Sequence, residues 1–355
     1  MSMTLYGVNP TSTIDLLKER ARRAKEGREP ADGRKLGLVV EGGAMRGVIS
    51  CAALMGLEEL GMTEVFDEVY GASAGAVNAA YFLAGQASYA TTIYYQQINN
   101  TRFIRRFWHR KIVDIDDLFD SIIAGQRPLR IEKVLAARSQ FFITIADACT
   151  GEAFLGHAQT SQTPLLTLLK ASTAMPLLYN GIIEVDGRDC FDGGLINPLP
   201  VLEAIESGCT DLLVLLTRPA SFRECLPSRL EQHFFDLRCA HGNTRLMSAF
   251  CNTYIRENAV RDIAFGRQTV PDGINIATVC PEESDPRIER TTRDALLLKS
   301  AAIASARLTL TVFGYVVEDF IEVLRPFPAI APKIDAIAAV EAGSGEPEGS
   351  TIAAA

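Results

Sequence analysis

Ser73 lies between two glycines in the stretch "EVYGASAGAVNAA", residues 68–80, at the G-x-S-x-G spacing of a nucleophilic serine. Such a serine must project its hydroxyl from a sharp turn between a strand and a helix, where only small neighbours fit. Every neighbour from Gly71 to Ala76 is small. A helix that starts after Ser73 would also direct its positive end toward a developing oxyanion. An ordinary tight turn can have the same spacing, so a nucleophile needs support from the rest of the chain.

A glycine-rich loop, "EGGAMRG" at residues 41–47, follows the short apolar run "LGLVV" at 36–40. Backbone N–H groups in such a loop, at the end of a neighbouring strand, can bind the oxyanion of an acyl-transfer reaction. The alternative is a dinucleotide-binding fingerprint, G-x-G-x-x-G, which also follows a first strand. In that register Ala44 occupies the second glycine position, where the backbone must approach a pyrophosphate, and this disfavours a nucleotide site.

Asp192 is the carboxylate candidate for a general base. In "CFDGGLINPLP", residues 190–200, it precedes two glycines after a predicted hairpin strand, so its side chain could reach a neighbouring strand end. Taken alone, the same residue would fit a turn or a cap. His233 and His241 come late enough for the order serine, aspartate, histidine of an ordinary triad. Their surroundings have a helical pattern, which favours surface or packed histidines.

The elements that must position these residues are two successive units of strand, glycine turn and helix. The first strand is expected at 36–40 and the second at 66–71, each followed by a helix, and this succession indicates a parallel α/β sheet. Ligands bind at the carboxyl ends of the strands in such sheets, where both glycine clusters fall. Further strands are expected within 141–157, 182–194, 211–219 and 274–279, and a helix at 199–207.

Composition limits the function classes. The chain has 355 residues, 48% of them hydrophobic, so a sizeable core is available. The net charge of −8 argues against nucleic acid as the main partner. Eight cysteines without a C-x-x-C pair, together with only four histidines, indicate reduced thiols rather than a disulfide framework or a zinc site. The N-terminus lacks the apolar region of a signal peptide, so we expect a cytoplasmic protein. The apolar run at 308–317 is too short to span a bilayer.

Three motifs together resemble those of the patatin-like phospholipase family, of the bacterial type. The family pattern is a glycine-rich oxyanion loop, then a G-x-S-x-G turn, then a D-G-G or D-G-A motif well downstream. Here they read "EGGAMRG", "GASAG" and "DGG", in that order, and "ASTAMP" at 171–176 is similar to the family's small-residue segment before the aspartate. The resemblance covers roughly residues 36–220 and implies a three-layer α/β/α fold with a mostly parallel central sheet.

The resemblance implies a role for each matching residue. Ser73 would be the nucleophile and Asp192 the base of a Ser-Asp dyad without histidine. The N–H groups of Gly42, Gly43 and Ala44 would form the oxyanion hole. The supporting motif residues would be Arg46, Gly47, Gly71, Gly75, Gly193 and Gly194. The family usually has glycine where this chain has Ala44, which can serve in the hole if its φ is not positive.

The implied activity is that of a lipid acyl hydrolase of the phospholipase A type, acting through an acyl-enzyme without metal or cofactor. An α/β-hydrolase esterase using His233 or His241 is one alternative, and a non-catalytic lipid-binding or scaffold protein with the same fold is another. The expected partner is a lipid or another acyl ester. Oligomeric state and head-group preference do not follow from the sequence.

The expected organisation has four parts. Residues 1–35 form a basic amphipathic leader with a solvated helix at 12–26, and residues 36–220 form the catalytic domain with a helical cap at about 87–140. Residues 221–325 form a mostly helical C-terminal region, and the Pro-, Ala- and Gly-rich residues 326–355 form a disordered tail. Within the cap, "RFIRRFWHRKI" at 102–112 interleaves arginines with aromatics, which is typical either of a packed cap helix or of a peripheral contact with the anionic inner membrane surface.

Overall fold

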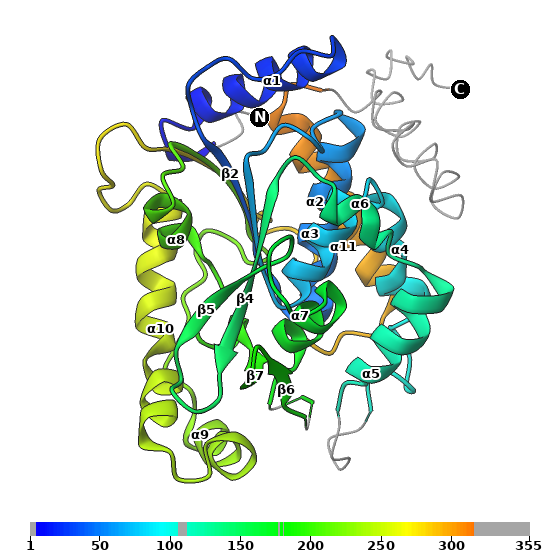
Figure 1. Ribbon diagram of the computed structural model, residues 1–355, viewed down its shortest axis with the longest axis vertical. Coiled ribbons are helices and arrows are strands. Elements are labelled where there is room, and N and C mark those ends of the chain that lie inside the picture. Colours follow the sequence, from blue (N-terminus) through cyan, green and yellow to red (C-terminus); the bar gives the residue numbers. More distant parts are fainter. Residues whose placement is uncertain (1–4, 106–111, 177, 180, 316–355) are drawn as a thin grey trace, which may run out of the picture. The chain divides into compact units, whose positions relative to one another are not determined.

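A central mixed sheet organises the chain, as seen in a computed structural model that describes residues 5–105, 112–176, 178–179 and 181–315 (Figure 1). The strands run in the order β1-β9-β8-β2-β3-β4-β7-β6, and β5 pairs with β4 outside this path. The five strands from β9 to β4 are parallel to one another. The strands are β1 (Tyr6–Val8), β2 (Leu36–Val40), β3 (Glu68–Ala72), β4 (Gln140–Asp147), β5 (Ala153–His157), β6 (Ile183–Val185), β7 (Arg188–Asp192), β8 (Asp211–Leu215) and β9 (Asn275–Val279).

Helices cover both faces of the sheet (Figure 1). On one face α8 and α10 pack on Val39, Tyr70 and Val214, and on the other lie α2, α3 and α11. The α-helices are α1 (Pro10–Lys25), α2 (Gly47–Glu59), α3 (Ala74–Leu83), α4 (Ala87–Gln96), α5 (Ile115–Asp117), α6 (Ile131–Leu135), α7 (Leu165–Thr173), α8 (Val201–Glu206), α9 (Arg229–Phe235), α10 (Thr244–Ala264) and α11 (Ala295–Val312). Short 3₁₀ turns, η1 (Ala44–Arg46) and η3 (Gly193–Leu195), and π-helical turns, η2 (Leu118–Gln126) and η4 (Asp236–Ala240), complete the set.

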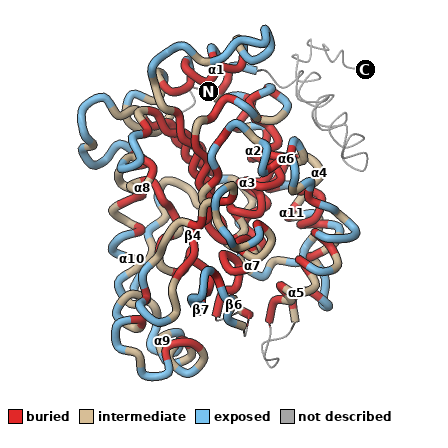
Figure 2. The backbone as a smooth tube through the Cα atoms, in the orientation of Figure 1, coloured by how far each residue is buried: buried red, intermediate tan, exposed pale blue. Residues whose placement is uncertain are grey.

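The apolar runs explain the layering. β2 and β8, with the sequences LGLVV and DLLVL, are buried at every residue, as strands covered by helices on both faces must be (Figure 2). The three-layer α/β/α fold and the mostly parallel sheet predicted from the sequence are therefore confirmed.

β3 and β7 lie end to end along the same edge of β4. Ile145 and Ala146 of β4 pair with both β5 and β7, so β5 and β7 lie on opposite edges of β4. Residues 142–144 of β4 pair with both β5 and β3, so β3 also lies on the edge opposite β5. β3 runs parallel to β4 and ends at Ala72 opposite Thr144. β7 runs antiparallel to β4 and ends at Asp192 opposite Ile145. The carboxyl ends of the two strands therefore meet.

The N-terminal segment is not a solvated leader, so that expectation is wrong. β1 pairs with β9, and α1 buries Ile14, Leu17 and Arg20. The amphipathic pattern correctly predicts a helix, but the apolar face of this helix packs on the sheet.

Residue 220 is also not a domain boundary. The predicted helices of 221–325 are present as α9, α10 and α11, yet the same segment supplies β9, which pairs with β8, and α11, which packs on α2. Residues up to Gly314 belong to one compact unit. The predicted disordered tail at 326–355 lies outside the described residues.

By length and composition α11 could cross a membrane, with a mean hydropathy of 1.4, and it is longer than the ten-residue run considered above. Core helices meet the same criterion. Here α11 buries Leu298, Ala302 and Ala306, and it packs on α2.

The burial of Arg20 generates a test. Its side chain, 1% exposed, is 2.9 Å from Asp32 and 2.6 Å from Asp67. Arg20→Ala should lower the free energy of unfolding by about 3 kcal/mol, because it removes one partner of a buried ion-pair network. Arg22→Ala, on the exposed side of the same helix, is the control and should leave urea denaturation unchanged. Equal midpoints for wild type and Arg20→Ala would mean that α1 is not part of the cooperative unit.

Candidate active site

Ser73 forms the tight turn between β3 and α3, with a strained backbone at φ 55° and ψ −133°. The close packing that requires small neighbours is present. A Cβ added to Gly75 would lie 2.3 Å from the carbonyl oxygen of Val40, and one added to Gly71 would lie 2.5 Å from Cα of Ala76. The N–H of Ser73 donates to Oγ of Ser172 at 3.0 Å, which orients the turn.

Ser172 was not identified as a site residue, although it lies within the "ASTAMP" segment. Its own hydroxyl donates to the carbonyl oxygen of Thr144 at 2.7 Å. Ser172 therefore links the Ser73 turn to β4, and the small residues around it at the end of α7 were the signal for this close packing.

Asp192 ends β7 directly beside Ser73. The Ser73 hydroxyl donates to Oδ2 of Asp192 at 2.7 Å, and the N–H of Gly194 donates to Oδ1 at 2.8 Å. A Cβ on Gly193 would lie 2.3 Å from the carbonyl oxygen of Thr144, so a larger residue could not pass β4 here. The structure thus brings together the serine and the aspartate singled out from the sequence, 119 residues apart.

Burial governs the protonation of Asp192. The residue is 0% exposed, and desolvation raises its pKa to about 7, while the bonds from Ser73 and Gly194 and the charge of Arg290 oppose this rise. A carboxyl with a pKa near the working pH is suited to accept a proton and return it.

The glycine-rich loop lies against the Ser73 turn. A Cβ on Gly42 would lie 2.4 Å from the carbonyl oxygen of Ala72 and 2.9 Å from Cβ of Ser73. Within the described part of the chain, the N–H groups of Gly43 and Ala44 have no hydrogen-bond acceptor. The loop can therefore offer N–H groups to an oxyanion beside Ser73.

Ala44 has a positive φ, although from the sequence we expect it to serve in the oxyanion hole only if its φ is not positive. Its φ is 51°, in the left-handed region, and Gly43 before it has a φ of 128°. An alanine in this region is strained by about 1 kcal/mol relative to glycine. The N–H is nevertheless present in the loop, so the substitution changes the strain of the loop and not its donor count.

Two other motif residues support the loop. A Cβ on Gly47 would lie 2.5 Å from the Tyr94 hydroxyl, and the guanidinium of Arg46 lies against Gly43. Arg46 is 6% exposed.

A buried ion-pair network holds the loop from the other side. Arg261 of α10 pairs with Glu41 at 2.5 Å and with Glu257 at 3.1 Å. Glu41 also accepts the N–H of Thr217, whose hydroxyl donates to the carbonyl oxygen of Gly42 at 3.1 Å. Sequence reasoning missed these residues. Glu41 stood inside the quoted loop, but no spacing relates it to Arg261.

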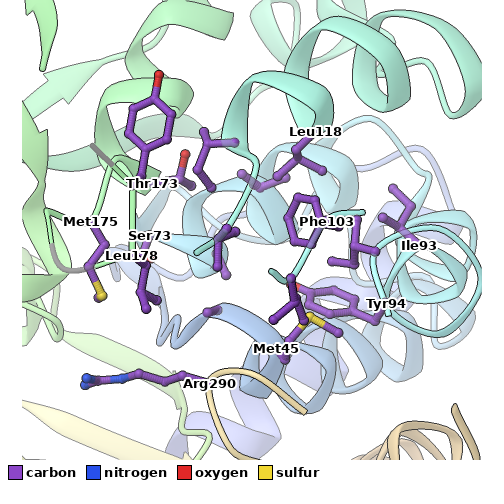
Figure 3. A pocket seen from close by; sticks show the side chains of 18 of the residues that line it. Met45, Ser73, Ile93, Tyr94, Phe103, Leu118, Thr173, Met175, Leu178 and Arg290 are labelled. Carbon is purple, nitrogen blue, oxygen red and sulfur yellow. The ribbon is translucent and has the colours of Figure 1, made fainter. Parts of the chain in front are cut away.

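A largely apolar pocket opens at Ser73 (Figure 3). Met45, Ile93, Tyr94, Phe103 and Leu118 lie on one side of it, and Met175 and Leu178 lie beside Ser73. Several of these side chains come from the segment predicted as a cap, which includes α4, α5 and η2. The pocket therefore combines a serine hydroxyl with space for an apolar chain.

The described histidines are not part of this site. His233 lies in α9 and His241 ends η4; among the residues that the structure describes, neither lines the pocket nor hydrogen-bonds to Ser73 or Asp192. Ser73 and Asp192 pair directly without them.

The predicted membrane segment is described only at its ends. Arg102 pairs with Asp117 at 2.8 Å, Arg105 pairs with Asp114, and Phe103 lines the pocket. Residues 106–111 lie outside the described residues. Contact with a membrane and the cytoplasmic location both stay predictions.

The buried carboxyl generates a stability test. Because the folded chain holds the Asp192 proton with a pKa of about 7 against an ordinary value of 3.8, folding favours the protonated form. Stability should therefore fall as the pH rises from about 4 to about 7. Asp192→Asn has no carboxyl group to titrate at this position. Its free energy of unfolding, minus that of wild type, should therefore increase by about 2 kcal/mol between pH 5 and pH 8. Urea denaturation at both pH values checks this, and a constant difference would contradict it.

Parts of this chain are similar to known proteins. Residues 38–205 match the family model of the patatin-like phospholipases. YjjU of Escherichia coli strain K12, named as an uncharacterized protein, is 27% identical over 195 residues, which are 52% of this chain and 53% of YjjU. The match thus spans about half of that relative. The crystal structure of VipD from Legionella pneumophila aligns with a TM-score of 0.42 and 11% identity over 79% of this chain and 67% of VipD. Over residues 38–205, just under half of its length, this chain is therefore similar to the patatin-like phospholipases.

Proposed function

We propose that this protein is a serine acyl hydrolase that cleaves fatty acyl esters of lipids, with Ser73 as nucleophile and Asp192 as general base. The observation that carries the proposal is the 2.7 Å hydrogen bond from the Ser73 hydroxyl to the buried Asp192 carboxylate, at the end of an apolar pocket. The family of the domain at 38–205 supports the same activity.

The proposed reaction has two steps. Asp192 accepts the Ser73 proton as Oγ attacks the ester carbonyl carbon, and the N–H groups of Gly42, Gly43 and Ala44 bind the oxyanion. The ester C–O bond then breaks, and the alcohol leaves with the proton from Asp192. In the second step water gives a proton to Asp192 as it attacks the acyl-enzyme. The fatty acid is released and Ser73 recovers its proton.

The pocket supports a lipid substrate of the phospholipase A type. Its apolar side chains, such as Ile93, Phe103 and Leu118, would bury a fatty acyl chain, and such burial contributes about 0.8 kcal/mol per methylene. Ser73 and Asp192 line the same pocket. An acyl chain in the pocket would therefore place its ester carbonyl at the serine.

Two alternatives make different predictions. A Ser-His-Asp esterase would need His233 or His241, and neither pairs with Ser73 or Asp192 in the described part of the chain. A non-catalytic lipid-binding protein would bind lipid in the same pocket without turnover. The strain at Ala44 is the one observation that favours this second alternative.

Substitutions at the dyad separate these functions. Ser73→Ala and Asp192→Asn should each lower kcat by about 10³-fold or more, because each removes a group that acts in the chemical step. His233→Ala with His241→Ala should retain turnover. The measurement is release of fatty acid from a panel of phospholipids and neutral acyl esters, followed by mass spectrometry. No release of fatty acid by either wild type or Ser73→Ala would favour a binding protein, and loss of turnover in the histidine variants as well as in Ser73→Ala would favour a triad.

Ala44 has its own test. Ala44→Gly removes the cost of a positive φ and should retain or raise kcat/KM. Ala44→Val should lower it about tenfold or more, because a β-branched residue is strongly disfavoured in this region. The measurement is hydrolysis of a short-chain nitrophenyl ester, with circular dichroism to check the fold. Full activity in Ala44→Val would mean that the loop does not need this conformation.

A further inference from the structure

Arg290 lines the pocket, and two arginines from other segments, Arg46 and Arg218, complete a group linked by its charges. Arg46 lies in the glycine-rich loop, Arg218 lies after β8, and Arg290 precedes α11. The N–H of Met45 donates to the carbonyl oxygen of Arg290 at 3.3 Å, and Arg290 lines the pocket together with Ser73 and Asp192. In Figure 3 the guanidinium of Arg290 lies apart from the apolar side chains of Ile93, Phe103 and Leu118.

These arginines repel one another. Burial, together with the positive charges of Arg290 and Arg218, lowers the pKa of Arg46 to about 10. The side chain of Arg46 is folded back with Nη2 2.8 Å from the position of a Cβ on Gly43, so it lies against the loop that would bind the oxyanion. The Arg46 guanidinium thus lies against the loop beside the reactive serine, and the positive charges of Arg290 and Arg218 act on it.

The three side chains have no described counter-ion. Within residues 5–105, 112–176, 178–179 and 181–315, no carboxylate lies within 4.0 Å of their guanidinium nitrogens. Nε of each is buried without a hydrogen-bond partner, as is Nη1 of Arg46, which is 6% exposed.

The carboxylates nearby are already engaged. Glu41 and Glu257 pair with Arg261. Glu231 accepts a hydrogen bond from the Ser228 hydroxyl, which lowers its pKa, and the positive charge of Arg290 contributes to this decrease. Several buried donors, all positively charged, therefore lack an acceptor. This is costly unless an anion supplies one.

We propose that Arg46, Arg218 and Arg290 form a binding site for a phosphate group beside Ser73. Guanidinium groups donate two parallel hydrogen bonds to phosphate oxygens, and three of them can surround one phosphate. Arg46 lies inside the family match at 38–205, whereas Arg218 and Arg290 lie in the part of the chain that the match leaves unassigned. That the phosphate comes from the head group of an acyl ester rests on the proposed hydrolase function. The anion site itself does not.

The first arm of the test is direct binding. Inorganic phosphate is titrated into the full chain by calorimetry, in chloride buffer of constant ionic strength. Arg218→Gln and Arg290→Gln should each weaken its binding about tenfold, as expected for the loss of a charge-assisted hydrogen-bond pair. Arg287→Gln is the matched control, because this arginine precedes Arg290 by three residues and its side chain is 79% exposed. Thermal denaturation of every variant checks the fold.

The second arm identifies the source of the phosphate. Hydrolysis of an acylglycerol phosphate is compared with that of the acylglycerol with the same chain, as a ratio of kcat/KM values. Arg218→Gln and Arg290→Gln should reduce this ratio about tenfold, whereas Arg287→Gln should not change it.

Each outcome of the two arms supports or overturns part of the proposal. A ratio that falls in the two variants supports a phosphate carried by the substrate. Weakened binding of inorganic phosphate with an unchanged ratio supports a site for free phosphate. If both variants match Arg287→Gln in the titration and in the ratio, the site is overturned. If the wild type hydrolyses neither ester, the proposed function fails, and the titration still tests the anion site.

Discussion

The meeting of β3 and β7 at one edge of β4 is the constraint on which the site depends. The two strands run toward each other along this edge, so their carboxyl ends lie side by side. Ser73 follows the end of β3, and Asp192 is the last residue of β7. The backbone register of β4 therefore sets the distance between the two side chains. Gly193 makes this possible, because its Cα passes so close to Thr144 that a Cβ would overlap the carbonyl oxygen.

The site combines the buried carboxyl group of Asp192 with a glycine-rich loop that residues outside the pocket hold in place. Asp192 is fully buried, and its bonds from Ser73 and Gly194 compensate only partly for the lost hydration. The glycine-rich loop is held through Glu41 and Thr217, and Glu41 in turn depends on Arg261 of α10. A strained loop conformation, with positive φ at Gly43 and Ala44, persists because its surroundings determine it.

The sequence predicts those features that depend on local chemistry. Glycines at 42, 71, 75 and 193 were recognisable because close backbone approaches exclude side chains, and the order of loop, serine and aspartate follows from the resemblance. Long-range contacts were not predictable. The pairing of β1 with β9 depends on partners more than 250 residues away. The pairing of Arg261 with Glu41 spans 220 residues without any periodicity. The sign of φ at Ala44 was not predictable, since alanine adopts a positive φ only under tertiary constraint.

The position of β8 has a consequence for how this domain could be inherited. The family match ends at residue 205, yet β8 lies inside the sheet between β2 and β9. A piece of chain ending there would leave β2 with an open, wholly apolar edge, of the kind that templates aggregation. It would also leave Glu41 buried without its arginine. The matched segment is thus smaller than the compact unit, which extends to Gly314, so recombination at residue 205 would transfer Ser73 and Asp192 without the strand that covers β2.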